Sequence, residues 1–247
     1  MFDMSYDVIL FDLDGTLTDS ADGIINSVVY ALEHMGIPCA DRLLQRRFVG
    51  PPLQDSFRDF YGFSEDEVNL AVRLFREYFS EKGIYENAVY KGIPEMLDSL
   101  QQAGMILAVA TSKPAAFAER ILARFDLAKY FTVIAGASMD GTDKPTVIRQ
   151  ALSRLGVTPS SRVLMVGDRK HDILGAKAVG IACLGVLYGY GSKEELQKAG
   201  ADRIASSPSE IVAECKWATP TRKCLPIAAW SVTKQCETAR TILRDIP

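Results

Sequence analysis

The sequence predicts an α/β fold built on a parallel sheet. Short apolar runs alternate with segments of helical periodicity, and this alternation is typical of parallel strands joined by crossover helices. The runs contain almost no polar residues, as strands buried on both faces should. A helical segment of about 70 residues separates the first two runs and is too long to be a loop. We therefore expect a Rossmann-like parallel sheet core with an inserted all-helical cap domain.

Five apolar runs are expected to form the strands of the core: residues 8–11, 105–110, 131–135, 163–166 and 181–187. Prolines and a capping-box pattern indicate where several of the intervening helices begin. Three prolines stand where a first helical residue is needed, because proline loses no hydrogen bond there: Pro94, Pro114 and Pro145. Ser192 and Glu195 have the spacing of a capping box, in which each residue satisfies a free backbone N–H of the other.

The long helical segment is expected to form the cap. Apolar residues recur at helical spacing from Ile24 to Met35, and Gly36 then ends that helix. Ser64 and Glu67 have capping-box spacing at the start of a second cap helix. The expected division of the chain is a core of residues 1–18 and 92–213, a cap of residues 19–91, and a C-terminal extension of residues 214–247.

The C-terminal extension has a different composition and receives no role. From Trp217 onward it carries three prolines, five basic residues and two acidic residues. Apolar residues from Val232 to Leu243 could form one stripe of a last helix. The extension leaves the interpretation of the preceding motifs unchanged.

Composition and charge argue against several classes of protein. The 247 residues carry a net charge of −3 and are 48% hydrophobic, which argues against disorder and against a surface for nucleic-acid polymers or anionic membranes. No apolar stretch is long enough to span a bilayer, and acidic residues stand where a signal peptide would be basic. The five cysteines lack CxxC spacing, which favours reduced thiols. A cytoplasmic monomer or homodimer is expected.

Polar residues follow the first apolar run and suggest a site for charged ligands. Asp12 and Asp14 come directly after it, at positions i and i+2. Side chains with this spacing point the same way from an extended chain, so the two carboxylates can share one site. Gly15 permits a tight turn that leaves backbone N–H groups free for an anion.

Three further polar clusters are expected at the same edge of the sheet. Thr111 and Ser112 follow the second run, Lys144 begins a helix, and Asp168 and Asp172 follow the fourth run. Open parallel sheets bind ligands at the carboxyl ends of their strands. Carboxylates suit Mg²⁺, and a lysine with hydroxyls at helix N-termini suits phosphate. The combination predicts Mg²⁺-assisted phosphoryl transfer.

The motifs resemble those of the haloacid-dehalogenase-like hydrolases. Four stand in the family's order: DLDGT at 12–16, Thr111, Lys144 and GDRKHD at 167–172. The resemblance covers about residues 6–211 and is specific for the branch that contains phosphoglycolate phosphatases and 5′-nucleotidases, with a helical cap inserted after the first strand. Residues 48–53 resemble the cap loop that faces the active site in those relatives.

The resemblance implies a role for each reacting group. Asp12 resembles the catalytic nucleophile that takes the phosphoryl group. Asp14 resembles the general acid that protonates the leaving oxygen and then activates water as a base. Thr111 and Ser112 resemble the donors to the phosphate oxygens, and Lys144 resembles the catalytic cation that holds them.

The resemblance also implies Mg²⁺ as the cofactor. Asp12, the backbone carbonyl of Asp14 and the carboxylate of Asp168 resemble the metal ligands. Asp172 resembles the residue that orients metal-bound water. Of two arginines beside the cap loop, Arg46 and Arg47, either could meet a second anionic group of the substrate.

These features predict a Mg²⁺-dependent phosphomonoester phosphatase that acts through an aspartyl-phosphate intermediate on a small phosphorylated metabolite. Phosphoglycolate is the first candidate substrate and a nucleoside 5′-monophosphate is the second. A sugar-phosphate mutase remains an alternative, because it uses the same core. A dehalogenase is disfavoured, since it lacks the second aspartate that Asp14 supplies. A binding protein without activity is disfavoured because all four motifs keep their reactive residues.

Overall fold

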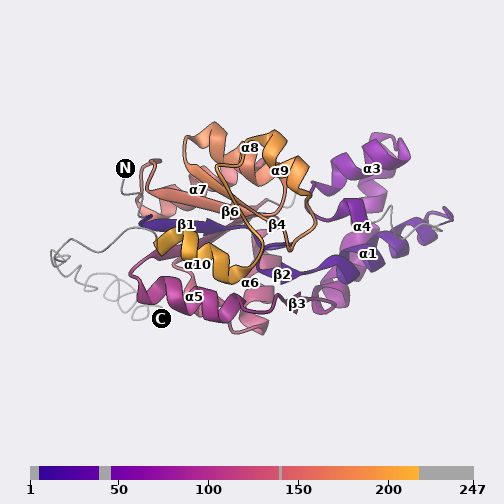
Figure 1. Ribbon diagram of the computed structural model, residues 1–247. Coiled ribbons are helices and arrows are strands. Elements are labelled where there is room, and N and C mark those ends of the chain that lie inside the picture. The colour runs from indigo at the N-terminus through magenta and orange to yellow at the C-terminus, as the bar shows by residue number, and fades with distance from the viewer. Residues whose placement is uncertain (1–5, 39–45, 139–140, 217–247) are drawn as a thin grey trace, which may run out of the picture.

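Six parallel strands form the central sheet of the structure, a computed structural model that describes residues 6–38, 46–138 and 141–216. The strands are β1 (Val8–Phe11), β4 (Ile106–Pro114), β5 (Val133–Ala137), β6 (Val163–Gly167), β7 (Ala182–Val186) and β8 (Arg203–Ala205). Their order across the sheet is β5-β4-β1-β6-β7-β8 (Figure 1). The predicted α/β class is confirmed. β1 lies between β4 and β6, so its carboxyl end reaches the middle of the sheet edge.

Helices cover both faces of this sheet (Figure 1). One face carries α5 (Ile93–Gln102), α6 (Ala115–Arg124) and α10 (Pro208–Lys216), and the other carries α7 (Lys144–Leu155), α8 (Lys170–Val179) and α9 (Lys193–Ala199). A 3-10 turn, η3 (Ala128–Tyr130), precedes β5. Alternate residues of β1 enter the two cores: Ile9 and Phe11 pack on the first side, and Val8 and Leu10 on the second. Both faces are buried, which explains the nearly continuous apolar runs.

Three details of the core differ from the sequence-based expectations. The short strand β8 was not expected, because its three residues include a charged arginine. β4 continues to Pro114 instead of ending at residue 110, with an irregular register from Thr111 onward. Pro114 has an extended backbone and precedes α6 instead of being its first residue. Pro94 and Pro145 lie in the first turns of α5 and α7, as predicted.

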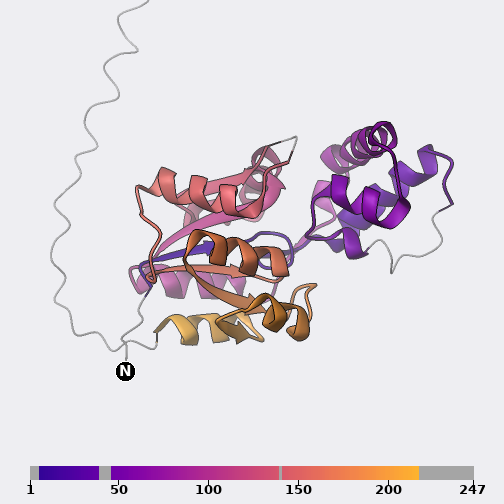
Figure 2. The ribbon, with the colours of Figure 1, turned by 90° about the horizontal axis from the view of Figure 1, so that it is seen from above.

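The cap lies to one side of the core and is joined to it by two chain crossings (Figure 2). Its helices are α1 (Ala21–His34), α3 (Leu53–Tyr61) and α4 (Glu65–Glu81), with 3-10 turns η1 (Arg46–Phe48) and η2 (Gly83–Tyr85). The predicted capping box begins α4: Glu67 N donates to Ser64 Oγ at 3.5 Å, and Ser64 N donates to Glu67 Oε2 at 2.8 Å. The apolar face of α4 is buried in the cap.

The cap is not wholly helical, because two short strands form its base. β2 (Thr18–Asp19) pairs antiparallel with β3 (Ala88–Val89). The chain enters the cap along β2 and returns along β3, so the two crossings run in opposite directions and can pair. Two-residue strands carry no periodicity, which is why the sequence did not reveal them.

The end of the described chain corrects two expectations. Ser192 Oγ accepts a hydrogen bond from Glu195 N at 3.1 Å, but Glu195 Oε1 accepts from Lys170 N at 2.8 Å instead of completing a capping box. α10 runs to Lys216, beyond residue 213. The helix expected near residues 232–243 lies outside the described residues. Among the described helices, none has the length and apolar character needed to cross a membrane.

Candidate active site

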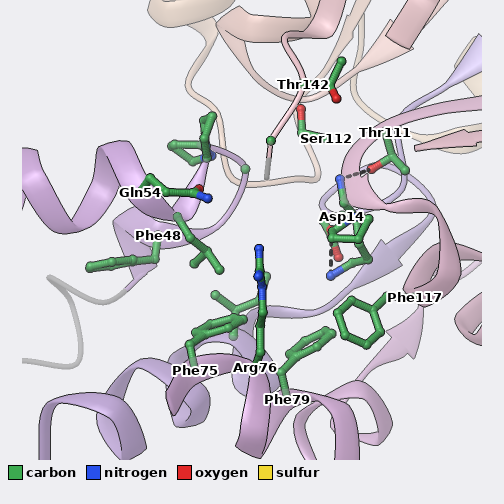
Figure 3. A pocket seen from close by; sticks show the side chains of 18 of the residues that line it. Asp14, Phe48, Gln54, Phe75, Arg76, Phe79, Thr111, Ser112, Phe117 and Thr142 are labelled. Atoms are coloured by element: carbon green, nitrogen blue, oxygen red, sulfur yellow. Dashed lines mark hydrogen bonds and ion pairs between the residues drawn. The ribbon is translucent and has the colours of Figure 1, made fainter. Parts of the chain in front are cut away.

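The predicted polar residues meet at the carboxyl edge of the sheet. Asp12 follows β1, Thr111 lies in β4, and Asp168 follows β6. These three strands are neighbours in the sheet, so their carboxyl ends open on one crevice. Figure 3 shows the crevice with Asp14, Thr111 and Ser112 on the core side and the cap helices opposite. Residues far apart in the sequence are thus brought to one place.

Lys144 is the central cation of the site. Its Nζ lies 2.9 Å from Asp12 Oδ1 and 2.7 Å from Asp172 Oδ1, and it donates to the Ala110 carbonyl at 3.1 Å. Its side chain is only 4% exposed, so it is no solvated surface lysine. Burial alone would lower the pKa of Lys144, but the two carboxylates outweigh burial and raise it. The side chain is therefore a permanent positive charge beside Asp12.

Three buried carboxylates form a cluster that fits a divalent cation. Asp12, Asp168 and Asp172 each offer one oxygen, and these oxygens lie within 4.8 Å of one another. Burial raises the pKa of Asp168 well above its usual value, and the charges of Asp172 and Asp12 raise it further. One lysine cannot neutralise three carboxylates, so a hard cation with oxygen ligands, such as Mg²⁺, would relieve the remaining repulsion.

The contacts of the three carboxylates indicate which of them are free to bind a metal ion. Asp172 Oδ1 pairs with Lys144, and its Oδ2 accepts from the Arg169 N–H at 3.0 Å, so both oxygens are engaged. Asp168 Oδ2 accepts from Tyr190 N at 2.8 Å, and its Oδ1 accepts only a long hydrogen bond of 3.4 Å from Thr16 Oγ1. Asp12 and Asp168 are therefore the better candidate metal ligands. Asp172 holds Lys144 in place, a contact that the sequence did not predict.

Asp14 faces the cap beside a second lysine. Asp14 Oδ2 pairs with Lys113 Nζ at 3.1 Å, and both side chains are largely buried. The same Nζ lies 4.3 Å from the centroid of the Phe79 ring of α4. Asp14 Oδ1 is buried without a hydrogen-bond partner among the described residues. Such an atom is costly unless a ligand or water binds it, which suits a carboxyl group that exchanges protons with a substrate.

Gly15 allows the first motif to close on the metal cluster. Its φ of +81° is disfavoured for other residues, and a Cβ there would lie 2.2 Å from Asp168 Oδ2. Thr111 Oγ1 accepts from Lys113 N at 3.1 Å. Thr111 and Ser112 line the pocket beside Asp12, where the sequence predicted phosphate donors.

The cap and the core helix α6 together supply an aromatic wall of the pocket. Three of its phenylalanines come from the cap and one from α6: Phe48, Phe75, Phe79 and, in α6, Phe117. Gln54 lies among them, and Arg76 extends from α4 between Phe75 and Phe79 into the pocket (Figure 3). The loop at residues 50–53 also lines this pocket. The leaving group of a substrate would meet this wall.

The cap contributes a different arginine to the pocket from the two that the sequence suggested. Arg47, a candidate for contacting a second anionic group, has its guanidinium carbon 4.3 Å from the centroid of the Phe60 ring and lines a separate cleft. The side chain of Arg46 lies outside the described part. Arg76 lines the main pocket instead. Its place in the cap helix gave no sequence pattern that could have identified it. Lys113, which pairs with Asp14, directly follows Thr111 and Ser112 and could have been predicted as a site residue.

The sheet, the inserted cap and the buried acidic cluster at the strand ends together define a Rossmann-like α/β protein with a cap domain beside its site. The chain belongs to the haloacid dehalogenase-like hydrolases, whose family model matches residues 9–186. Several of its relatives and structural neighbours are named as phosphatases, and the chain is an enzyme of this phosphatase group. The resemblance inferred from the four motifs is thereby confirmed.

Individual relatives differ in the activity that their names give. A 5′-nucleotidase of Pseudomonas aeruginosa is 46% identical over 78% of this chain and 88% of its own. The tyrosine-protein kinase PtkA of Mycobacterium tuberculosis is 43% identical over 77% of this chain and 65% of its own. A phosphoglycolate phosphatase of Vibrio parahaemolyticus is 33% identical over 83% and 94%. The crystal structure of a predicted phosphatase from Clostridium acetobutylicum matches with a TM-score of 0.82 and 46% identity, over 85% and 98% of the two chains.

Proposed function

We propose that the chain hydrolyses phosphomonoesters with Mg²⁺ through a phosphorylated Asp12. The observation that carries the proposal is the buried contact of Asp12 Oδ1 with Lys144 beside Asp168. The lysine fixes the carboxylate and offsets its charge, so that an anionic phosphoryl group can approach. An Asp carboxylate is a known type of nucleophile in phosphoryl transfer.

The reaction proceeds in two displacements. In the first, Asp12 attacks phosphorus, the bond to the leaving oxygen breaks, and Asp14 gives that oxygen its proton. In the second, water attacks phosphorus, Asp14 takes the proton of the water, and the bond between phosphorus and Asp12 breaks. The orphaned and buried Asp14 Oδ1 supports this acid–base role.

The remaining residues bind the phosphoryl oxygens and the metal. Thr111 and Ser112 donate hydrogen bonds to the phosphoryl oxygens, and Lys144 neutralises them. Asp12, Asp168 and the backbone carbonyl of Asp14 would hold Mg²⁺. The metal would supply charge stabilisation as the phosphoryl group transfers. Asp172 keeps Lys144 directed at Asp12.

Phosphoglycolate and nucleoside 5′-monophosphates are the two candidate substrates. Phosphoglycolate is the one that the sequence favours. The second has an observation of its own, because the pocket wall carries four phenylalanines and Arg76. Aromatic rings can stack on the planar base of a nucleoside leaving group, and a guanidinium can donate hydrogen bonds to the acceptors on the edge of that base. The 46% identity to a 5′-nucleotidase supports the same choice.

A phosphate-release assay tests the proposal. The panel contains phosphoglycolate, nucleoside 5′-monophosphates, sugar phosphates and pyrophosphate, each with Mg²⁺ and with a chelator. We expect Mg²⁺-dependent release that Asp12→Asn abolishes. The control Asp126→Asn, at an exposed pair with Lys129 that does not line the pocket, keeps full activity. Phosphate transfer between sugar phosphates without release would instead support a mutase, and activity of Asp12→Asn at the wild-type rate would refute the nucleophile.

A further inference from the structure

A short loop of the core connects the metal cluster to the base of the cap. The backbone N–H of Tyr190 donates to Asp168 Oδ2 at 2.8 Å. The phenol of the same residue donates to Asp19 Oδ1 at 2.7 Å and accepts from the Ser20 N–H at 2.9 Å. Tyr190 thus bonds to a candidate metal ligand with its main chain and to the cap entrance with its side chain.

The two residues held by the phenol lie at the point where the chain leaves the core. Asp19 ends β2, and Ser20 directly precedes α1, the first cap helix. A rotation of the cap about its base must change the backbone here. Such a rotation either stretches both hydrogen bonds to the phenol or moves Tyr190 with it.

The loop packs tightly against Asp168. A Cβ at position 189 would lie 2.4 Å from Asp168 Cβ, and one at position 191 would lie 1.9 Å from the Asp168 carbonyl oxygen. Only glycine permits these approaches, and Gly189 and Gly191 flank Tyr190. The main chain of the loop therefore contacts Asp168 on both sides, and the two segments form one unit.

The second crossing between core and cap reaches the same loop. Tyr90 follows β3, and its ring packs against the Tyr188 ring with centroids 5.1 Å apart. Tyr188 in turn donates from its hydroxyl to the Thr16 carbonyl at 3.0 Å. Both chain crossings at the base of the cap are thus in contact with loop residues 188–190.

We propose that Tyr190 is a positioning residue that couples cap closure to the metal-binding carboxylate of Asp168. A cation that fixes Asp168 also fixes the Tyr190 backbone, and the phenol then holds Asp19 and Ser20 in the closed arrangement. By linkage, a closed cap must strengthen metal binding by the same factor. The inference rests on the metal site of the proposed function.

The test compares Tyr190→Phe with wild type in two measurements that do not depend on turnover. Calorimetry gives the dissociation constant of Mg²⁺, and hydrogen exchange gives the protection of the Ser20 and Ala21 amides with and without Mg²⁺. In wild type, Mg²⁺ slows exchange at these amides. In Tyr190→Phe, this protection is lost and Mg²⁺ binds about fivefold or more weakly, the lower end of usual coupling factors.

A matched variant controls for the loss of a phenol. The Tyr30 hydroxyl donates to Glu77 at 2.7 Å within the cap, so Tyr30→Phe removes a tyrosine–carboxylate bond of the same kind away from the base of the cap. It keeps wild-type Mg²⁺ affinity and protection. Asp19→Ala removes the acceptor from the other side and replaces Tyr190→Phe if that variant does not fold. We expect it to lose the Mg²⁺-dependent protection of Ser20.

Three results overturn the coupling, and only the last of them also removes the proposed function. If wild type binds Mg²⁺ but exchange at Ser20 and Ala21 is unchanged by the metal, or if Tyr190→Phe binds Mg²⁺ as tightly as wild type, the coupling alone is wrong. If wild type neither binds Mg²⁺ nor releases phosphate, the proposed function fails and the coupling fails with it.

Discussion

Replacing Lys144 with methionine tests the electrostatics of the site most severely. In wild type the ammonium lies within 3 Å of oxygens on Asp12 and Asp172, and its side chain is 4% exposed. Methionine has a similar length and no charge. Lys144→Met therefore leaves buried carboxylates without their cation and changes the packed volume little.

The expected loss of stability is large for one substitution. Removing one member of a buried ion pair costs about 3–5 kcal/mol, because the other charge stays buried and unpaired. Here two carboxylates lose the same partner, so we expect the upper half of that range. The comparison is Lys177→Met, whose pair with Asp202 is 43% and 47% exposed with 3.4 Å between the charged atoms. An exposed pair of this kind contributes roughly 0–1 kcal/mol.

The loss should also depend on pH, with a definite sign. Burial raises the pKa of Asp172 to about 6 in wild type, although Lys144 opposes this shift. Without the lysine, the folded-state pKa of Asp172 rises further above its unfolded value. A raised pKa gives stability that is present below the unfolded pKa and is lost as pH rises through the folded pKa. The free energy of unfolding of Lys144→Met should therefore be close to that of wild type at about pH 5 and lowest relative to wild type at about pH 7.5.

Urea unfolding of both variants at the two pH values, without Mg²⁺, measures these differences. The reasoning is refuted if Lys144→Met loses no more stability than Lys177→Met at pH 7.5. It is also refuted if the gap between Lys144→Met and wild type widens as the pH falls.

Four further predictions follow from the site and the cap. Gly15→Ala places a methyl group onto Asp168, so kcat with saturating Mg²⁺ should fall on the order of 10²-fold; a wild-type kcat would contradict the contact. Ser64→Ala should lower the free energy of unfolding by about 1 kcal/mol through loss of the helix cap, while kcat stays unchanged. Arg76→Met should raise KM for the best substrate about tenfold or more with little change in kcat; an unchanged KM would remove Arg76 from substrate binding. Mg²⁺ at about 100 times its Kd should add about 2.7 kcal/mol of stability, seen as a higher Tm that Asp168→Asn abolishes.

Residues at strand ends were predictable because the sequence itself carries their location. An apolar run fixes where a buried strand ends, and Asp12, Thr111 and Asp168 stand at or beside such ends. Parallel topology then brings those ends together. The helix start at Lys144 was predicted differently, from Pro145 as a residue of the first helical turn, and it is confirmed at α7.

The contacts between cap and core could not be predicted in the same way. Arg76 lies on a helix whose periodicity gives its buried face but not its position relative to the sheet. Tyr190 contacts Asp19 across 171 residues of sequence, and no local pattern encodes such a pairing. Glu195 shows a related limit, because its spacing fits a capping box but its carboxylate accepts from Lys170 N at 2.8 Å and from Arg169 Nε at 2.9 Å instead.

The central claim is that Asp12 becomes phosphorylated, and trapping that species tests it most directly. In Asp14→Asn the acid–base group is gone, so an ester with a good leaving group, such as p-nitrophenyl phosphate, should phosphorylate the enzyme faster than water releases the phosphate. After rapid acid quench, peptide mass mapping should find one phosphoryl group on Asp12. One equivalent of nitrophenol should appear as a burst, and the double variant with Asp12→Asn should show neither. A phosphoryl group on another residue, or steady turnover without any phosphoenzyme, would contradict the account.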